Sequence, residues 1–142
     1  MSAWEDLAAG VRAGTVPAEV VSRWLLAQPQ LWFVVEGEFD EAGRPQNVRP
    51  LIVHHPSGAT VSLLFTDEAR AQRYRASRDD LTEPLGVVGV PPVVSFETLL
   101  QLPIDGITIN PGDPSRLNAG RRQLEALAAA ARANTPSRDA LR

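Results

Sequence analysis

Residues 105–115, Asp-Gly-Ile-Thr-Ile-Asn-Pro-Gly-Asp-Pro-Ser, constrain the fold of this chain more than any other segment. Their first half is short and rich in β-branched residues, which is typical of a strand. Pro111 and Gly112 suit the two central positions of a type II turn. Asp113 suits a helix N-cap and Pro114 suits the first helical position. The segment is therefore expected to end a strand, turn tightly and begin the last helix.

Hydrophobic periodicity divides the rest of the chain into further helices and strands. The expected helices cover residues 2–14, 17–28, 66–77, 95–102 and 114–132, and the expected strands cover residues 31–35, 47–54, 60–65, 86–90 and 105–109. Local signals for helix starts are a capping box from Ser2 to Glu5, an N-cap at Thr66 and another at Ser95.

The order of these elements predicts the fold class. The first three strands have short connections, which favours an antiparallel meander. Helices separate the last three strands, which favours parallel pairing through right-handed crossovers. We therefore expect an α+β domain with a mixed β-sheet, made of an antiparallel three-strand meander plus two crossover strands. Helices pack on this sheet, and a helical pair precedes it.

Size and composition indicate one soluble domain. The 142 residues are 44% hydrophobic and suffice to bury a core, so residues 1–133 are expected to form a single domain. Residues 1–29 form an N-terminal helical extension of it, and residues 134–142 a flexible tail. The chain has no cysteine, which excludes disulfides and cysteine-based chemistry. Without a basic leader or a long apolar run, we expect a cytoplasmic protein that does not enter a membrane.

The charge pattern argues against nucleic acid as a partner. The net charge is −3, whereas nucleic-acid-binding domains usually carry a basic excess. All 14 basic residues are arginine, which we interpret mainly as the mark of GC-rich coding. The functional alternative is recognition of anions or carboxylates by forked guanidinium groups.

Two blocks of sequence resemble the SseB N-terminal-domain family. The first is residues 62–70, Ser-Leu-Leu-Phe-Thr-Asp-Glu-Ala-Arg, followed by Tyr74 on the same helix. The second is residues 96–100, Phe-Glu-Thr-Leu-Leu, followed by the Asn-Pro-Gly turn of residues 110–112. The resemblance covers about residues 31–127 and leaves out the two leading helices. It implies the fold and a non-enzymatic role, and it offers no catalytic residues. From the chain as a whole we expect no cofactor. Longer members have a second, C-terminal domain, for which we expect this chain to be too short.

The densest basic cluster lies on the expected helix after residue 66. Arg70 and Arg73 share one side of this helix, while Arg75 and Arg78 fall on another. One interpretation is a solvated surface in which Asp67 and Arg70 pair across one turn. The other is a docking patch for an acidic protein partner. The candidate partner-binding residues are Arg70, Arg73, Arg75 and Tyr74.

A strand-lined pocket is the alternative kind of site. Glu36, Arg49 and His54 come from adjacent expected strands and could line a small-ligand or enzyme pocket. Neighbouring strand residues point to opposite faces, so His54 and His55 are not expected to bind one metal. No nucleophile-elbow pattern supports a triad of Ser57, His54 and Asp67. The acidic loop with Asp79, Asp80 and Glu83 lacks calcium-site spacing and is expected to be solvated.

The tryptophans leave the oligomeric state open. Trp4, Trp24 and Trp32 all fall in the first 32 residues, where they either pack the first helices on the sheet or expose an apolar surface. The second alternative predicts a homo-oligomer through the N-terminal helices. Our first hypothesis for function is a non-catalytic protein-interaction or regulatory module with an unknown protein partner. The alternative is a ligand-binding protein or enzyme.

Overall fold

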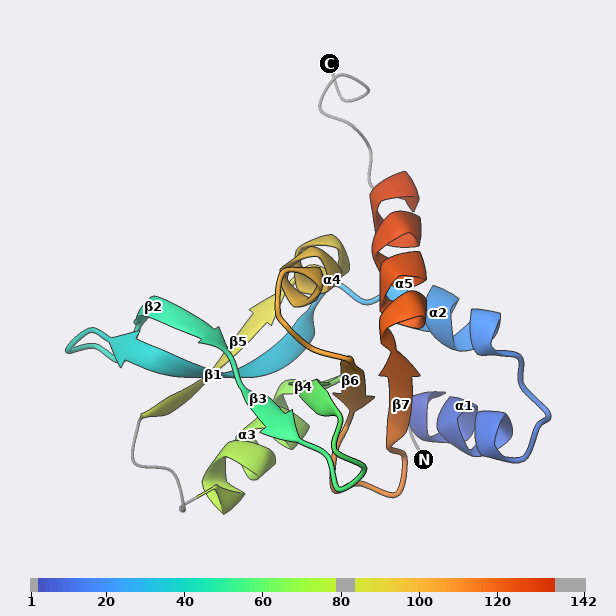
Figure 1. Cartoon of the computed structure of the whole chain (residues 1–142), viewed down its shortest axis with the longest axis horizontal. Coiled ribbons are helices and arrows are strands. Elements are labelled where there is room, and N and C mark those ends of the chain that lie inside the picture. The colour runs from blue at the N-terminus through green and yellow to red at the C-terminus, as the bar shows by residue number, and fades with distance from the viewer. Residues whose placement is uncertain (1–2, 79–83, 135–142) are drawn as a thin grey trace.

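The computed structural model describes residues 3–78 and 84–134 and contains the helices and strands of an α+β domain (Figure 1). The helices are α1 (Ala3–Arg12), α2 (Ala18–Leu26), α3 (Glu68–Ser77), α4 (Pro92–Leu100) and α5 (Arg121–Asn134). The strands are β1 (Leu31–Phe39), β2 (Pro45–Pro50), β3 (Ile52–His54), β4 (Thr60–Leu64), β5 (Leu85–Val90), β6 (Gly106–Ile109) and β7 (Leu117–Gly120). Ser2, the acidic loop at residues 79–83 and the tail beyond residue 134 lie outside the described residues.

The strands form two sheets that meet at β1 and β4. One sheet has the order β2-β1-β5 and the other the order β3-β4-β6-β7. Trp32 and Phe65 exchange two backbone hydrogen bonds of 2.9 Å and so join the sheets. The strand expected at residues 47–54 breaks at Leu51, because its first half pairs with β1 and its second half with β4. The α+β class, the antiparallel meander and the N-terminal helix pair are thus confirmed.

Strand β5 has a different neighbour from the one expected. It pairs antiparallel with β1 at the far edge of the sheet, and not as a parallel crossover strand. Strand β6 does pair parallel with β4, as the crossover pattern predicts. Alternation of helices and strands indicates crossovers, but it does not say beside which strand each returning segment lies.

The last helix begins later than expected. Residues 117–120 form β7, which pairs antiparallel with β6, and α5 begins only at Arg121. Asp113 does not cap a helix, because its Oδ1 accepts hydrogen bonds from the backbone N–H and hydroxyl of Ser115 in a local turn. The type II turn is confirmed, since Gly112 has a φ of +77° and the Asp113 N–H donates to the Asn110 carbonyl at 3.2 Å.

Two other helix starts differ by one to three residues from those expected. The N-cap of α3 is Asp67 and not Thr66, because the Asp67 carboxylate accepts from the Arg70 N–H at 2.8 Å. Helix α4 begins at Pro92, and Ser95 lies inside it with its hydroxyl donating to the Val90 and Pro91 carbonyls. Proline in the first turn supplies the start signal there.

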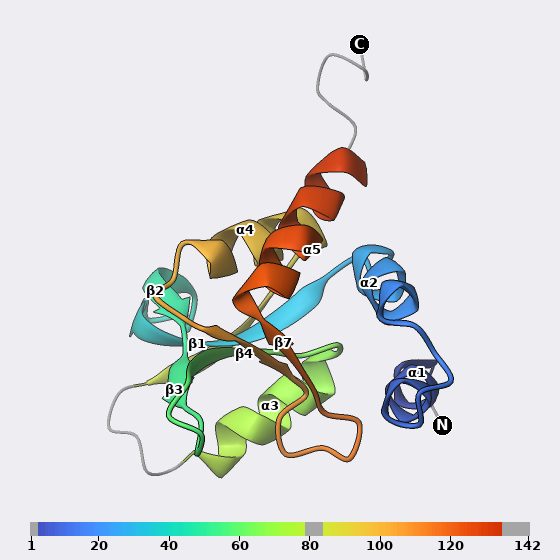
Figure 2. The same ribbon diagram turned by 45° about the vertical axis from the view of Figure 1, so that its right-hand side comes forward.

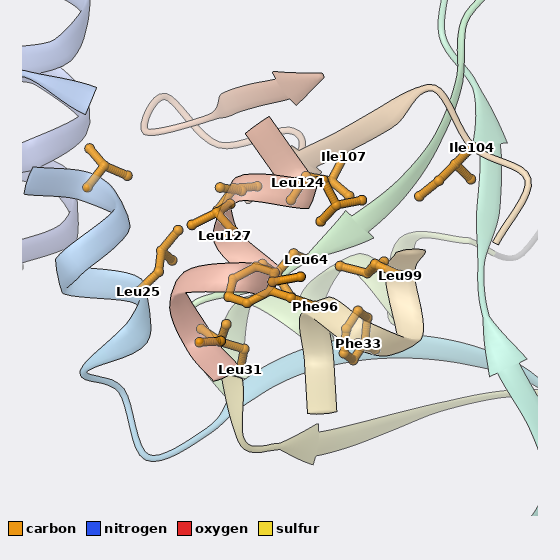
Figure 3. Packing of buried hydrophobic residues seen from close by; sticks show 14 of the residues in the cluster. Leu25, Leu31, Phe33, Leu64, Phe96, Leu99, Ile104, Ile107, Leu124 and Leu127 are labelled. Carbon is orange, nitrogen blue, oxygen red and sulfur yellow. The ribbon is translucent and has the colours of Figure 1, made fainter. Parts of the chain in front are cut away.

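Helices α4 and α5 lie on one side of the strands and α3 on the other (Figure 2), and an apolar cluster fills each side. The larger one lies beneath α4 and α5 and beside α1 and α2, and Figure 3 shows Phe33, Phe96 and Leu124 within it. The smaller one includes Val34 and Ala71 and lies beneath α3. Neighbouring residues of β1 point to opposite faces, so Phe33 and Val34 enter different clusters. Helix α3 covers this face, on the side of the sheets away from α4 and α5 (Figure 1).

Candidate functional site

Helix α3 rests on the sheet through a narrow strip of apolar contacts. Ala71 is fully buried, and the Tyr74 ring lies 5.6 Å from the Phe65 ring between centroids. Arg73 and Arg75 are exposed on the solvent side. The helix thus contacts the sheet through Ala71 and Tyr74, and its opposite side faces solvent.

The turn of residues 110–113 is fixed beside the start of α3 by Asn110. This side chain is fully buried; its Oδ1 accepts from the Thr66 N–H at 3.1 Å and its Nδ2 donates to the Thr66 hydroxyl at 2.9 Å. Its φ of +53° lies in the left-handed region, which asparagine tolerates better than most residues with a side chain. The strand-to-turn junction after β6 is therefore pinned to the strand-to-helix junction after β4.

Arg70 is the centre of an ion cluster that ties three parts of the chain together. Its side chain is 12% exposed and pairs with Glu5 on α1 at 2.7 Å, with Asp113 in the turn at 3.2 Å, and with Asp67 at the cap of its own helix. Burial alone would lower the pKa of Arg70, but hydrogen bonds to Asp113 and Asp67 outweigh it and raise that pKa. Three carboxylates of the domain thus surround the single Arg70 charge.

The pKa of Asp113 moves in the opposite direction. Its burial would raise this pKa, but hydrogen bonds from the Ser115 hydroxyl and N–H and from Arg70 lower it overall. One Asp113 oxygen accepts from Ser115 and the other from Arg70. Both oxygens are therefore engaged in holding the turn.

A cleft of about 440 Å³ lies between α3 and this turn; we call it the α3 cleft. Its lining residues are Arg70, Arg73, Tyr74 and Ser77 from α3 and Asn110, Pro111, Gly112 and Asp113 from the turn. Three of the four candidate partner-binding residues therefore come together. Arg75 does not line the cleft, and its Nε donates to Gln72 at 3.0 Å.

Arg73 differs from the other arginines of α3. Arg70 is paired with acids, Arg75 bonds to Gln72, and the Arg78 guanidinium donates to the Tyr74 hydroxyl at 2.6 Å. Arg73 is exposed and has no hydrogen bond or ion pair to another residue among those that the structure describes. It is thus the cleft's available cation.

Sequence reasoning did not place the turn residues in this site. Asn110, Pro111 and Gly112 are more than thirty residues from α3 in the chain, and they reach it because β6 lies beside β4. The sequence offered one signal for this arrangement. The two family-like blocks contain the ends of β4 and β6, and parallel pairing of these strands places both ends at the same edge of the sheet.

The alternative pocket assembles only in part. Glu36 and Arg49 lie opposite each other on β1 and β2 and form an ion pair of 3.0 Å beside a hollow of about 540 Å³. His54 is exposed at the end of β3, in the other sheet, and does not line this hollow. No cluster of three or more metal-ligating side chains occurs within residues 3–78 and 84–134.

The N-terminal helices pack into the domain through tryptophan. Trp4 is 1% exposed, its Nε1 donates to the Ser115 carbonyl and hydroxyl, and its ring lies 5.4 Å from that of Trp24. The Trp4 indole is therefore part of the core and not an exposed surface. Oligomerisation through these helices stays a prediction. Among the described helices, none is both long and apolar enough to cross a membrane.

Comparison with known proteins identifies a family. The model of the SseB protein N-terminal domain matches residues 5–126 of the chain. The match includes α2 and α1 from Glu5 onward, whereas the two sequence blocks predicted a resemblance that leaves out both helices. No curated protein matches the chain significantly in sequence.

Proposed function

The chain belongs to the family of SseB N-terminal domains, and we propose that it is a non-catalytic protein-interaction module whose α3 cleft binds an acidic segment of a partner protein. The observation that carries this proposal is the Arg73 guanidinium, which has no partner among the described residues and lies at a cleft whose other charged lining residues, Arg70 and Asp113, are paired with each other. A planar guanidinium binds a carboxylate through two parallel hydrogen bonds, which favours an aspartate or glutamate side chain as its partner.

The charge of the cleft favours an acidic over a basic ligand. Asp113 is the acid among the lining residues, and its two oxygens already accept from Arg70 and Ser115. A basic ligand would have to displace those bonds, whereas a carboxylate meets Arg73 without breaking any. Binding an acid therefore costs less reorganisation of the site.

The remaining lining residues suit a peptide chain. Tyr74 and Pro111 provide partly exposed apolar area, of the kind that anchors protein interfaces. Gly112 is exposed and has no side chain, so a bound backbone can approach the turn closely. The Asn110 bonds to Thr66 hold the two walls of the cleft in place before binding, which reduces its entropic cost.

The hydroxyl groups of the cleft are engaged in structural bonds. The Ser77 hydroxyl donates to the Tyr74 carbonyl at 2.7 Å, and the Tyr74 hydroxyl accepts from Arg78. No histidine or cysteine lies among the residues that line the cleft, so none stands next to Ser77 as a general base. This favours binding over catalysis.

The test is quantitative capture from a lysate of the native host with the wild-type protein, Arg73→Glu and Arg122→Glu. Arg122 is an exposed arginine on α5 that also lacks a partner among the described residues, so its reversal makes the same change in net charge. We expect at least one protein to be retained by wild type and Arg122→Glu and lost about tenfold or more from Arg73→Glu. Equal retention by all three would refute the role of the cleft.

The small-ligand alternative would use the hollow beside Glu36 and Arg49. These two charges neutralise each other, and the Arg49 side chain is 71% exposed, so the pair offers a ligand little unbalanced charge. We therefore place this hypothesis second.

A further inference from the structure

Strand β5 is an edge of the sheet, and its outer backbone groups are open. Trp32 bonds to Phe65, and the Val34 carbonyl accepts from Leu51, so these β1 residues direct their backbone groups away from β5. In an antiparallel pair, alternate residues bond to alternate sides. Leu31, Phe33 and Val35 therefore bond to Val90, Val88 and Gly86, and Leu85, Val87 and Gly89 direct their N–H and C=O groups outward.

Nothing in the described part of the chain pairs with this outer edge. No backbone hydrogen bond from residues 3–78 or 84–134 reaches the outward groups of Leu85, Val87 or Gly89, and all six residues of β5 are partly exposed. The strand has the sequence Leu-Gly-Val-Val-Gly-Val, with no charge or proline to discourage a further strand. An edge of the other sheet, β7, has only four residues, and its Gly120 N–H already donates to Gln123.

The two glycines of β5 leave gaps that aromatic rings of the same chain occupy. A Cβ at Gly89 would lie 2.7 Å from the Trp32 ring, and a Cβ at Gly86 would lie 2.5 Å from the Phe39 ring. The rings lie on opposite faces of the sheet, because Gly86 and Gly89 differ by an odd number of positions. A strand added beyond β5 would thus meet an aromatic ring on each face.

We propose that β5 pairs antiparallel with β5 of a second copy of this chain, about a two-fold axis at Val87, and that the sheet continues across the dimer. This register uses all three outward residues, because Leu85 then faces Gly89 of the second copy and Val87 faces its own equivalent. Shifting the register by two residues in either direction removes one of these pairs.

Side-chain size favours a second copy over an unrelated strand. In this register each glycine of β5 faces a large aliphatic side chain, Leu85 opposite Gly89 and Val88 opposite Gly86. Leu85 of one copy then packs against Trp32 of the other, which is half-buried and lies over Gly89. The six residues carry no charge, so the two copies bring no like charges together along the strand.

The proposal goes beyond the interaction function and is independent of it. Arg73 and the turn of residues 110–113 take no part in the β5 edge. Failure of one hypothesis therefore leaves the other standing.

Sedimentation velocity of the full chain from about 5 to 500 µM tests the proposal, with Val87→Pro and Val87→Ala as matched variants. Proline removes the outward N–H without removing a bond to β1, whereas alanine trims the side chain and keeps the N–H. We expect wild type and Val87→Ala to reach twice the 15.4 kDa of the chain, with the dimer weakened about tenfold or more in Val87→Pro. A monomeric wild type, or a Val87→Pro dimer as tight as wild type, would overturn the proposal.

A second experiment decides the question if Val87→Pro fails to fold. The chain has no cysteine, so Val87→Cys introduces a single thiol at the two-fold axis. A short bifunctional thiol reagent should link it into a covalent dimer, and Gln46→Cys, exposed on β2, should link only at the level of random collision. Equal linkage of the two variants would contradict the register, and so would capture of some other protein by Val87→Cys without linkage of two copies.

Discussion

Replacing Asn110 by alanine is expected to destabilise the domain by about 3 kcal/mol. Asn110 is fully buried and makes two hydrogen bonds to Thr66, whose N–H would be left buried without a partner. Losing these bonds should cost about 2 kcal/mol. The φ of +53° adds about 1 kcal/mol, because alanine tolerates the left-handed region less well than asparagine.

Asn110→Gly separates the two contributions. Glycine adopts a positive φ at little cost but makes no bond to Thr66, so it should lose only about 2 kcal/mol. Urea unfolding followed by tryptophan fluorescence measures both variants, since Trp4 is buried in the folded domain. With a slope of about 2 kcal/mol per M, alanine should lower the urea midpoint by about 1.5 M and glycine by about 1 M. Equal midpoints would show that the positive φ of Asn110 carries no cost for alanine, and a loss below about 0.5 kcal/mol for either variant would show that the bonds to Thr66 do not stabilise the domain.

Four other substitutions test contacts of the site and of the β1–β2 pair. Arg70→Met should lower the free energy of unfolding by about 2 kcal/mol, because it removes the cation that three carboxylates share. Salt screens the repulsion among these carboxylates, so the loss should be smaller in 1 M salt. Thermal melting at two ionic strengths measures the difference. Folding lowers the pKa of Asp113, so the stabilisation by its charge is complete above the ordinary pKa of about 3.9 and is lost as the pH falls through the folded-state pKa. Asp113→Asn should therefore be less stable than wild type at pH 7, and its stability should change less with pH below pH 4. Urea midpoints measured across this pH range test both expectations. Gly37→Ala should destabilise the domain by about 3 kcal/mol or more, because its Cβ would lie 2.2 Å from the Asn47 carbonyl oxygen. Gly58 also has a positive φ but faces open space, so Gly58→Ala should cost only about 1 kcal/mol in the same denaturation assay. A similar loss in the two glycine variants would show that β1 and β2 do not approach as closely as described.

Local sequence patterns predicted where helices and strands lie better than they predicted which strands pair with one another. The β1 strand, the N-terminal helix pair and the type II turn at Pro111 follow from residue types that act within a few positions. The β7 strand was missed because Asp113 and Pro114 form a good helix start in isolation. In the folded chain Asp113 bonds to Arg70, which is 43 residues away, and that contact has no local signature.

The candidate site was predicted in part for the same reason. Helical spacing placed Arg70, Arg73 and Tyr74 on one element, and all three line the cleft. Spacing could not show that Arg70 is balanced by acids from α1 and the turn, which leaves Arg73 as the available cation. His54 was grouped with Glu36 because residues 47–54 were expected to be one strand, and the break at Leu51 sends His54 to the other sheet.

Site-specific photo-crosslinking inside the native host tests whether the α3 cleft binds an acidic segment of a partner protein. A photoreactive residue at Ser77 lies in the α3 cleft, and one at Arg122 lies on the exposed surface of α5. We expect position 77 to become linked to a segment rich in aspartate or glutamate, position 122 not to be linked to it, and Arg73→Glu to abolish the link. Identical products at both positions, or a segment without acidic residues at position 77, would contradict it.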